Sequence, residues 1–232
     1  MDKEDIVDSY YKAYDKRYYQ VYSNDMLWSS KEPTKEVLEF LKRYNCEKSD
    51  LILDLGCGEG RDAISLLDMK YNVLAVDYSI NVIEKCNNLS NNKYKDSFIQ
   101  FDIMKDELTK KFKYIYSIAV LHMFVTDEHR NLFFKFVKDH LTDDGVALIC
   151  ILGDGVKEHS SDITKSFENT QRVVMNNNTN IEIAATSCKI VSWETLEKEI
   201  INNDLKIKEK WISKEIPEFT NSMCVVISKY KN

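Results

Sequence analysis

The sequence predicts an α/β fold of the doubly wound, Rossmann-like kind, on two observations. Strand-like apolar runs alternate along the chain with segments of helical periodicity, a pattern that requires right-handed crossovers and a mostly parallel sheet covered on both faces. In addition, three of the six glycines (Gly56, Gly58 and Gly60) lie at every second position directly after an apolar run, in "LILDLGCGEGRDA" (51–63). Glycine accepts positive φ and lets a ligand come close to the backbone, so we expect a binding site at this turn.

The N-terminal third begins with helices. A helical segment spans roughly residues 3–22, because apolar and aromatic side chains recur there near helical spacing, and a second helix starts around Pro33. The strand-like runs that follow are 51–55, 72–77, 97–101, 114–120 and 146–152, with helical segments near 60–69, 79–90 and 127–140 between them.

The C-terminal third begins with a polar stretch, 153–180, rich in Asn and Ser. A helix near 193–203 and two strand candidates, 205–212 and 223–230, follow. Only ten residues and no helix separate these two strands, so we expect them to pair antiparallel.

We expect a single domain over 1–232, because no internal repeat or low-complexity linker divides the chain. Within it, the pattern distinguishes four parts: an N-terminal helical cap or lid (1–45), a ligand-binding core (46–152), an insertion that is a candidate substrate cover (153–192), and a C-terminal helix with its strand pair (193–232).

Composition excludes several classes of protein. The formal charge of −6 disfavours a nucleic-acid partner, and 44% hydrophobic with 30% charged residues is ordinary for a soluble globular protein. The apolar run 146–152 is too short to span a membrane, and the start of the chain is acidic where a signal peptide would be basic. We therefore expect a cytoplasmic protein with no membrane partner. The oligomeric state stays open.

The six cysteines and four histidines do not form a recognisable metal site. No CxxC pair occurs, and no histidine lies at ligand spacing from a cysteine. We expect neither a metal nor a disulfide framework.

Three acidic residues follow successive predicted strands. Asp54 lies two residues before Gly56, and Asp77 ends the second strand at the place where a carboxylate binds both hydroxyls of a ribose. Asp102 follows the third strand, where it could reach an adenine edge while Phe101 and Ile103 line the base pocket. Taken alone, each acid is more often a solvated residue at a strand end or a helix cap than a ligand-binding residue. The three together favour a nucleoside ligand.

Four segments of the core resemble the class I S-adenosylmethionine-dependent methyltransferases: "LDLGCGEG", "VLAVDYS", "FIQFDI" and "YSIAVLHMF". The resemblance covers about 51–152. The stretches "GCGEGRDA" and "LWSSKEPTKEV" (27–37) are most similar to small-molecule members of the tellurite-resistance and thiopurine methyltransferase type. The resemblance implies a seven-stranded sheet with a reversed last strand, S-adenosylmethionine as cofactor, and a small-molecule methyl acceptor.

For this cofactor, the expected contacts divide along the chain. Backbone amides of 56–60 would receive the methionine carboxylate, Asp54 would orient the amino end, and Asp77 would hold the ribose. Asp102 would accept from the adenine amino group while the Ile103 amide donates to the ring. The full set of expected cofactor residues is Trp28, Asp54, Gly56, Cys57, Gly58, Arg61, Asp77, Tyr78, Asp102, Ile103 and Ala119.

Two of these residues have alternative interpretations. Arg61 either contacts the cofactor carboxylate or pairs with Asp62 or Glu59 on a helix surface. Cys57 has no base close in sequence, so it is better explained as a small side chain between glycines than as a nucleophile.

We expect the methyl acceptor to bind near His122, which follows the fourth strand. His122 is also the best candidate for a general base. A histidine at the edge of the core is an equally good interpretation. The expected substrate residues are Tyr18, Tyr22, His122 and Met123. The tyrosine-rich N-terminal segment is either a lid, with Trp28 near the sulfonium, or an amphipathic helix docked on the sheet.

Two other functions stay open at this stage. A nicotinamide oxidoreductase would share the crevice and the ribose carboxylate, but the third glycine of "GxGxxG" is missing because position 61 is arginine. A noncatalytic S-adenosylmethionine-binding protein would carry the same binding residues, and only a methylated product separates it from the enzyme.

Overall fold

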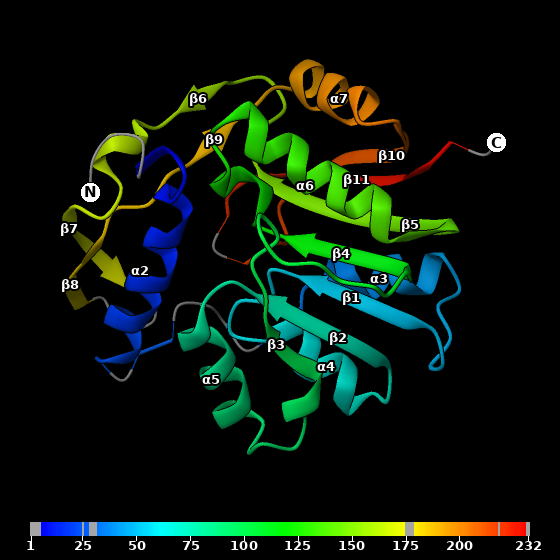
Figure 1. The fold of residues 1–232 in the computed structure, drawn as a ribbon, viewed down its shortest axis with the longest axis horizontal. Helices are drawn as coiled ribbons and strands as arrows, with labels where there is room; N and C mark the ends of the chain where they lie inside the picture. Colours follow the sequence, from blue (N-terminus) through cyan, green and yellow to red (C-terminus); the bar gives the residue numbers. More distant parts are fainter. Residues whose placement is uncertain (1–5, 25, 28–31, 175–178, 218, 231–232) are drawn as a thin grey trace.

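The computed structural model of the chain describes residues 6–24, 26–27, 32–174, 179–217 and 219–230. Its centre is a seven-stranded sheet in the order β10-β11-β5-β4-β1-β2-β3 (Figure 1). The strands are β1 (Leu51–Leu55), β2 (Asn72–Asp77), β3 (Phe98–Gln100), β4 (Phe112–Ile118), β5 (Leu141–Leu152), β10 (Leu205–Ser213) and β11 (Ser222–Lys229).

Strand directions confirm the predicted topology. β1 pairs in parallel with β2 and β4, β2 with β3, and β4 with β5. β11 is antiparallel to both of its neighbours, β5 and β10, so it is the reversed strand of the sheet. The carboxyl ends of the parallel strands all meet at one edge, which is where ligands bind in open α/β sheets.

Helices cover both faces of the sheet because side chains alternate along each strand. Ile52 packs on the face covered by α3 (Lys35–Arg43), α4 (Arg61–Asp68) and α5 (Ile80–Leu89). Leu53 and Leu55 pack on the opposite face, against α6 (Asp127–His140) and α7 (Trp193–Asn202). The result is a three-layer sandwich of helix, sheet and helix.

Side-chain caps fix where three of these helices begin. Ser79 accepts a hydrogen bond from the amide of Val82 at 3.2 Å, at the start of α5. Thr126 and Ser192 do the same for α6 and α7. Each cap satisfies an amide that the helix itself leaves unpaired.

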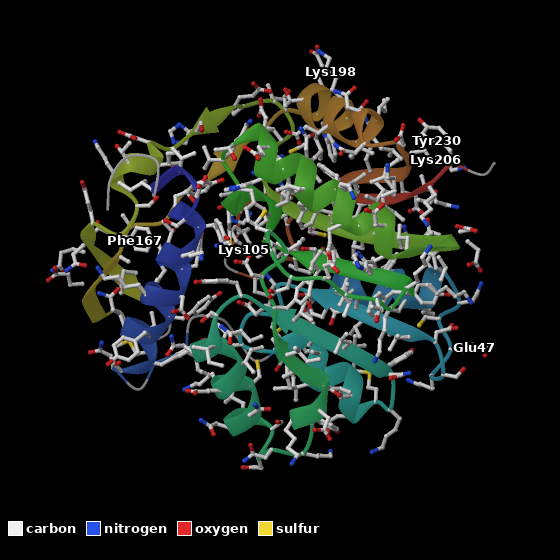
Figure 2. The ribbon with its side chains drawn as sticks, viewed as in Figure 1. Glu47, Lys105, Phe167, Lys198, Lys206 and Tyr230 are labelled. Carbon is white, nitrogen blue, oxygen red and sulfur yellow. The ribbon has the colours of Figure 1, made fainter. Side chains whose placement is uncertain are left out.

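A cap lies at the carboxyl ends of the parallel strands and is built from two distant parts of the chain, 6–24 and 159–190 (Figure 1). The first part holds η1 (Tyr10–Lys12) and α2 (Ala13–Tyr22), and the second holds β6 (His159–Ser160), η4 (Ile163–Lys165), β7 (Asn169–Val174), β8 (Thr179–Ala184) and β9 (Lys189–Ile190). In Figure 2, Phe167 marks this cap, and Glu47, in the loop that enters β1, lies on the opposite side of the molecule.

Hydrogen bonds join the two parts of the cap. Arg17 donates from Nε and Nη2 to the carbonyl of Ala184, at 3.0 and 2.9 Å. Gln20 accepts from the Ala184 amide at 2.7 Å, and the Tyr14 hydroxyl donates to the carbonyl of Ser187 at 3.1 Å. The N-terminal helix therefore rests on β8 and on the segment after it.

Several element boundaries differ from the sequence prediction. β4 ends at Ile118 and not at residue 120, because Ala119 takes a left-handed φ of 61° that no strand can continue through. β5 begins at Leu141, since exposed Asp143 and Asp144 hide the start of its apolar pattern. The polar stretch 153–180 holds β6, β7 and the start of β8, which its weak alternation did not predict; β6 pairs antiparallel with β9, and β7 with β8.

The predicted N-terminal helix is interrupted: Ile6 and Val7 are helical, the short η1 turn follows a two-residue turn, and α2 begins at Ala13. Tyr10 is fully buried, and its hydroxyl accepts from the amides of Val125 and Thr126, at 2.8 and 3.2 Å. It also lies 3.0 Å from Nδ1 of His129. This end of the segment is docked into the core. No helix in the described ranges is both long enough and apolar enough to cross a membrane.

Candidate functional site

A cavity of about 300 Å³ lies between the cap and the carboxyl ends of β1, β2 and β4. Its walls come from the glycine loop, the end of β2, the turn after β4 and both parts of the cap. The lining residues used below are Tyr11, Tyr14, Asp15, Arg17, Tyr18, Asp54, Gly56, Cys57, Gly58, Glu59, Arg61, Asp62, Asp77, Tyr78, Phe101, Ile103, Ala119, Val120, His122, Met123, Phe124, Leu152, Thr186, Cys188 and Phe219.

The glycine loop needs glycine for two different reasons. At Gly56, φ is 82° and a Cβ would lie 2.3 Å from Cγ2 of Val120, so neither the backbone nor the space allows a side chain. At Gly58, φ is 52° but the closest atom to a Cβ would be the Tyr18 hydroxyl at 3.7 Å. The turn after β4 therefore packs directly against the loop after β1.

The loop amides are already hydrogen-bonded within the protein. The amides of Gly56 and Cys57 both donate to the carbonyl of Val76 at 2.9 Å, that of Gly58 donates to Asp77, and that of Gly60 donates to the Cys57 carbonyl at 3.0 Å. Four of the five amides expected to receive a methionine carboxylate are thus already bonded within the protein. They hold the loop to the end of β2.

Asp77 lies at the predicted place, at the end of β2 and in the cavity wall. Its two carboxylate oxygens accept from the amides of Gly58 and Ser79, at 3.0 and 2.9 Å. Burial raises the pKa of Asp77 to about 6, against the stabilising effect of these two bonds. Each oxygen keeps a further lone pair for a ligand.

Asp54 lies deeper, with its Oδ2 accepting from the Tyr116 hydroxyl at 2.9 Å. Burial, and then the neighbouring Asp62, raise the pKa of Asp54 well above its ordinary value. Asp62 accepts from the amide and hydroxyl of Thr34 and lies 3.9 Å from Nε of Arg61. Arg61 thus shows the ion pair of one interpretation and also lines the cavity, as the other requires.

The expected adenine end is arranged differently from the prediction. Ile103, Phe101 and Tyr78 line the cavity, but Asp102 does not. The Asp102 carboxylate accepts from the Tyr11 hydroxyl, at 3.0 and 3.2 Å, and from the Met104 amide at 3.0 Å. The Tyr11 ring lies edge-on to Tyr78, with 5.6 Å between ring centroids.

Cys57 lines the cavity as a protonated thiol. A side-chain hydrogen bond between Cys57 and Cys86 that favours the protonated Cys57 thiol, together with burial, raises the pKa of Cys57 well above its usual range. The two sulfurs lie 3.6 and 3.2 Å from the same carbonyl, that of Gly58. This environment fits a small packing residue and not a nucleophile.

The turn after β4 carries the acceptor-side residues. Ala119, His122 and Met123 all line the cavity, the last two in η3 (Leu121–Met123). Burial, and then the charge of Arg130, lower the pKa of His122 to about 4, so its imidazole is neutral near pH 7. Its buried Nδ1 has no hydrogen-bond partner among the described residues, and the ring lies edge-on to Phe219 with 5.7 Å between centroids.

Only one of the two cap tyrosines predicted to bind the substrate lines the cavity. Tyr18 lines the cavity, whereas Tyr22 does not and instead stacks on Tyr18 with 5.8 Å between centroids. Trp28 lies outside the described residues. Sequence reasoning did not single out Arg17, Thr186, Cys188 or Phe219 as site residues. Only the folded cap brings the first three to the sheet edge, and Phe219 reaches it from the loop between β10 and β11.

Comparison with known proteins decides the class. Residues 52–145, which include the glycine loop, Asp77 and His122, match the family model described as a methyltransferase domain. Residues 52–145 are therefore a methyltransferase domain, and the fold around them is the one that class I S-adenosylmethionine-dependent methyltransferases share. S-adenosylmethionine is the cofactor of this domain, and the methyltransferase is an enzyme of the transferase class. The match decides between the two enzyme classes that the glycine loop left open.

Solved structures agree on the fold of the methyltransferase. An S-adenosylmethionine-dependent methyltransferase from Clostridium acetobutylicum is 19% identical, covers 94% of this chain and 98% of its own, and has a TM-score of 0.63. The CcbJ methyltransferase from Streptomyces caelestis is 12% identical, with coverages of 93% and 98% and a TM-score of 0.68. No curated protein sequence matches the chain.

A third structure was solved with both a cofactor product and an acceptor. It is the 1,6-didemethyltoxoflavin-N1-methyltransferase from Burkholderia thailandensis, with bound 1,6-didemethyltoxoflavin and S-adenosylhomocysteine. It is 14% identical, covers 97% of this chain and 86% of its own, and has a TM-score of 0.62. At these identities the likeness concerns the fold of the methyltransferase.

Proposed function

We propose that the methyltransferase transfers a methyl group to a nitrogen, sulfur or oxygen atom of a small, largely apolar molecule. The observation that carries this proposal is that a single cavity of about 300 Å³ is lined by the glycine loop, by the turn that holds His122 and by both parts of the cap. A cap bonded across the strand ends leaves room for a small acceptor. The net charge of −6 also disfavours a nucleic-acid acceptor.

The cofactor half of the cavity is assigned to the residues at the ends of β1, β2 and β3. We assign the ribose to Asp77, whose oxygens keep free lone pairs, and the methionine end to Asp54 and Arg61. The base lies among Tyr78, Phe101 and Ile103. When bound, S-adenosylmethionine supplies an electrophilic methyl group on a positively charged sulfur.

The acceptor half is assigned to the turn after β4, the cap, the end of β5 and the loop between β10 and β11. Its lining is uncharged apart from Arg17, and consists of His122, Met123, Leu152, Thr186, Cys188 and Phe219. A neutral imidazole accepts a proton or a hydrogen bond from an N–H, S–H or O–H group, so His122 orients the nucleophile and removes its proton. Apolar walls exclude water from the reacting atoms.

One of the similar structures supports a small acceptor. The Burkholderia thailandensis enzyme holds a heterocyclic small molecule. The proposed closeness of this chain to the tellurite-resistance and thiopurine type stays a prediction from the "GCGEGRDA" stretch.

The proposal is tested by product analysis. The full chain is incubated with S-adenosylmethionine and, separately, benzenethiol, benzylamine and phenol, and with tRNA or protein in further arms, and both S-adenosylhomocysteine and methylated product are measured by mass spectrometry. A methylated product from a member of this panel supports the proposal. Methylation of added tRNA or protein with none of the small molecules contradicts it, and cofactor binding with no methylated product in any arm indicates a noncatalytic binder.

A further inference from the structure

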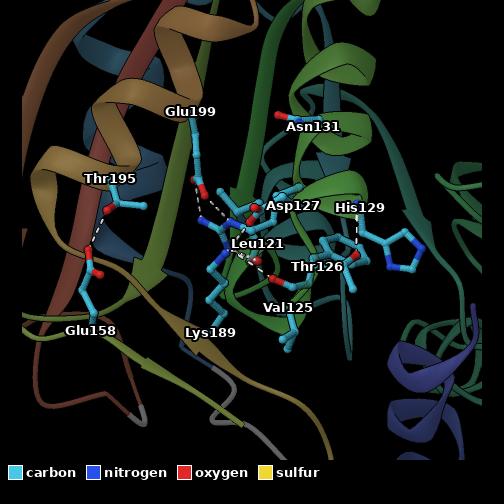
Figure 3. A network of polar contacts seen from close by, with 12 residues as sticks. Leu121, Val125, Thr126, Asp127, His129, Asn131, Glu158, Lys189, Thr195 and Glu199 are labelled. Atoms are coloured by element: carbon cyan, nitrogen blue, oxygen red, sulfur yellow. Dashed lines mark hydrogen bonds and ion pairs between the residues drawn. The ribbon is translucent and has the colours of Figure 1, made fainter. Parts of the chain in front are cut away.

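Arg130, on α6, is the largest fully buried side chain among the described residues, with 0% of its surface exposed. Its Nε and Nη2 donate to the two carboxylate oxygens of Glu199 on α7, at 2.6 and 2.7 Å. Its Nη1 donates to the carbonyls of Leu121 and Phe124, at 3.0 and 3.3 Å. One guanidinium thus joins α7 to the turn after β4, where Figure 3 shows Glu199 and Leu121 on the two sides of the network.

The two carbonyls bracket the acceptor-side residues. Leu121 and Phe124 lie immediately before and after His122 and Met123, both of which line the cavity. The Met123 carbonyl is held separately, by the Ser187 hydroxyl of the cap at 2.9 Å. The η3 turn is therefore fixed from the helix layer on one side and from the cap on the other.

This turn needs such support because of its backbone. Ala119, at its start, has a φ of 61°, and an alanine keeps a left-handed conformation only where the surrounding structure holds it. On the other side of η3, the Tyr10 hydroxyl accepts from the amides of Val125 and Thr126. The strained segment thus lies between anchored ends.

Stability alone does not explain a buried Arg–Glu pair. Removing two charges from water is costly, and replacing such a pair with apolar side chains of similar volume is often neutral or stabilising. Four of the five guanidinium N–H groups of Arg130 are used, and two of them go to main-chain carbonyls of the active-site turn. That geometry requires a planar fork, which lysine does not offer.

We propose that Arg130 is a positioning residue that, anchored by Glu199, fixes the η3 turn so that His122 and Met123 keep their place in the acceptor half of the cavity. This inference rests on the proposed function, which assigns His122 to the acceptor. The charge of Arg130 has a second effect on His122: together with burial, it lowers the pKa of the imidazole and so keeps the ring neutral.

The test measures the turn itself and needs no acceptor. Arg130→Lys keeps the charge and loses the fork, Arg130→Met with Glu199→Met removes the pair without leaving a lone buried charge, and Lys138→Met is the matched control. Lys138 is also on α6 and pairs with Asp204, beyond the end of α7, at 3.1 Å on the surface, away from η3. Amide hydrogen exchange is followed by mass spectrometry on peptides that cover 119–126, the helices α6 and α7, and strands β1 and β2.

We expect exchange in 119–126 to become about tenfold faster in both Arg130 variants, since the two hydrogen bonds to the carbonyls of the turn are lost or weakened. Exchange in β1 and β2 stays as in the wild type, and Lys138→Met changes neither. In the double variant, ring NMR of the His122 imidazole, assigned with His122→Gln, also shows its pKa rising above the wild-type value of about 4.

Unchanged exchange in 119–126 in the Arg130 variants overturns the proposal. Equal acceleration over α6, α7 and the central strands overturns it as well, because it indicates a general packing role. If Arg130→Lys does not fold, the double variant gives the same decision. The proposed function fails on a different result, methylation of tRNA or protein with none of the small molecules, so the two failures are distinguishable.

Discussion

The hydroxyl of Tyr11 lies 3.0 Å from Oδ2 and 3.2 Å from Oδ1 of Asp102, so the first turn of the cap is bonded to the loop after β3. Both residues are buried, and Asp102 is one of the three acids that follow successive strands. An acid expected to meet the cofactor thus also anchors the N-terminal segment. Because Tyr11 itself lines the cavity, the cap and the base pocket share a wall.

Tyr11→Phe removes a hydrogen bond to a buried carboxylate and is expected to lower the free energy of unfolding by about 1.5 to 3 kcal/mol. For a chain of this size, that corresponds to a decrease in Tm of about 3 to 12 °C, measured by calorimetry. Tyr19→Phe is the control, because Tyr19 is 60% exposed. Equal melting temperatures for the two variants would show that the Tyr11–Asp102 bond contributes nothing to stability.

The sheet and its binding edge could be predicted from the sequence because both depend on local pattern. Buried strands read as apolar runs, and the glycine loop and Asp77 lie next to the strands that carry them. Arg17 and Thr186 could not be predicted as site residues because they reach the cavity only through the packing of the cap, and Phe219 because it reaches the cavity from the loop between β10 and β11. The position of Asp102 after the third strand could be predicted, but its hydrogen bond with Tyr11 could not, because Tyr11 is 91 residues away in the sequence.

The close packing of Gly56 against Val120 gives a second prediction. Gly56→Ala adds a Cβ where Cγ2 of Val120 would be 2.3 Å away, at a φ of 82°, so we expect a loss of about 3 kcal/mol or more in the free energy of unfolding. Gly58→Ala has the same kind of backbone strain but open space, and should lose only about 1 kcal/mol. Denaturant unfolding measures both.

A double variant separates the clash from the backbone strain. Gly56→Ala with Val120→Ala removes the contacting methyl groups and should recover part of the loss. The proposed contact between the loop and the turn after β4 would be contradicted if Gly56→Ala is no less stable than Gly58→Ala. It would also be contradicted if adding Val120→Ala recovers none of the lost free energy of unfolding.

Asp77 makes a prediction that depends on pH. An ionised carboxylate accepts from ribose hydroxyls, and the pKa of Asp77 is raised from 3.8 to about 6. Affinity for S-adenosylhomocysteine should therefore fall about tenfold between pH 7.5 and pH 5, as the carboxylate takes up a proton. In the absence of ligand the sign is opposite: the raised pKa contributes stability that is present below about pH 4 and lost as pH rises through about 6.

Asp77→Asn is the matching variant, because it keeps an oxygen for the amides of Gly58 or Ser79. Calorimetric titration at pH 7.5 should show affinity weakened about 10- to 150-fold, and the pH dependence should disappear. Asp68→Asn, an exposed acid on α4 that pairs with Lys93, is the control. An unchanged affinity in folded Asp77→Asn would place the ribose elsewhere.

His122 makes the acceptor-side prediction. His122→Gln should reduce kcat for the methylated panel compound by about 100- to 10,000-fold while cofactor affinity is unchanged. Because burial lowers the pKa of His122 to about 4, the wild-type rate should show no loss from His122 protonation between pH 8 and pH 5.5. His159→Gln makes the same chemical change at an exposed histidine of β6 and should be silent. Comparable rates in the two variants would remove His122 from the reaction.

Thermal unfolding with and without ligand tests the central claim most directly, that this cavity is an S-adenosylmethionine site. At about 100 times its dissociation constant, S-adenosylhomocysteine adds roughly 2.7 kcal/mol to the stability of the folded chain, which raises Tm by about 5 to 10 °C. The account predicts this increase with S-adenosylhomocysteine and with S-adenosylmethionine, and none with NAD. An increase with NAD and none with either sulfur compound would contradict it.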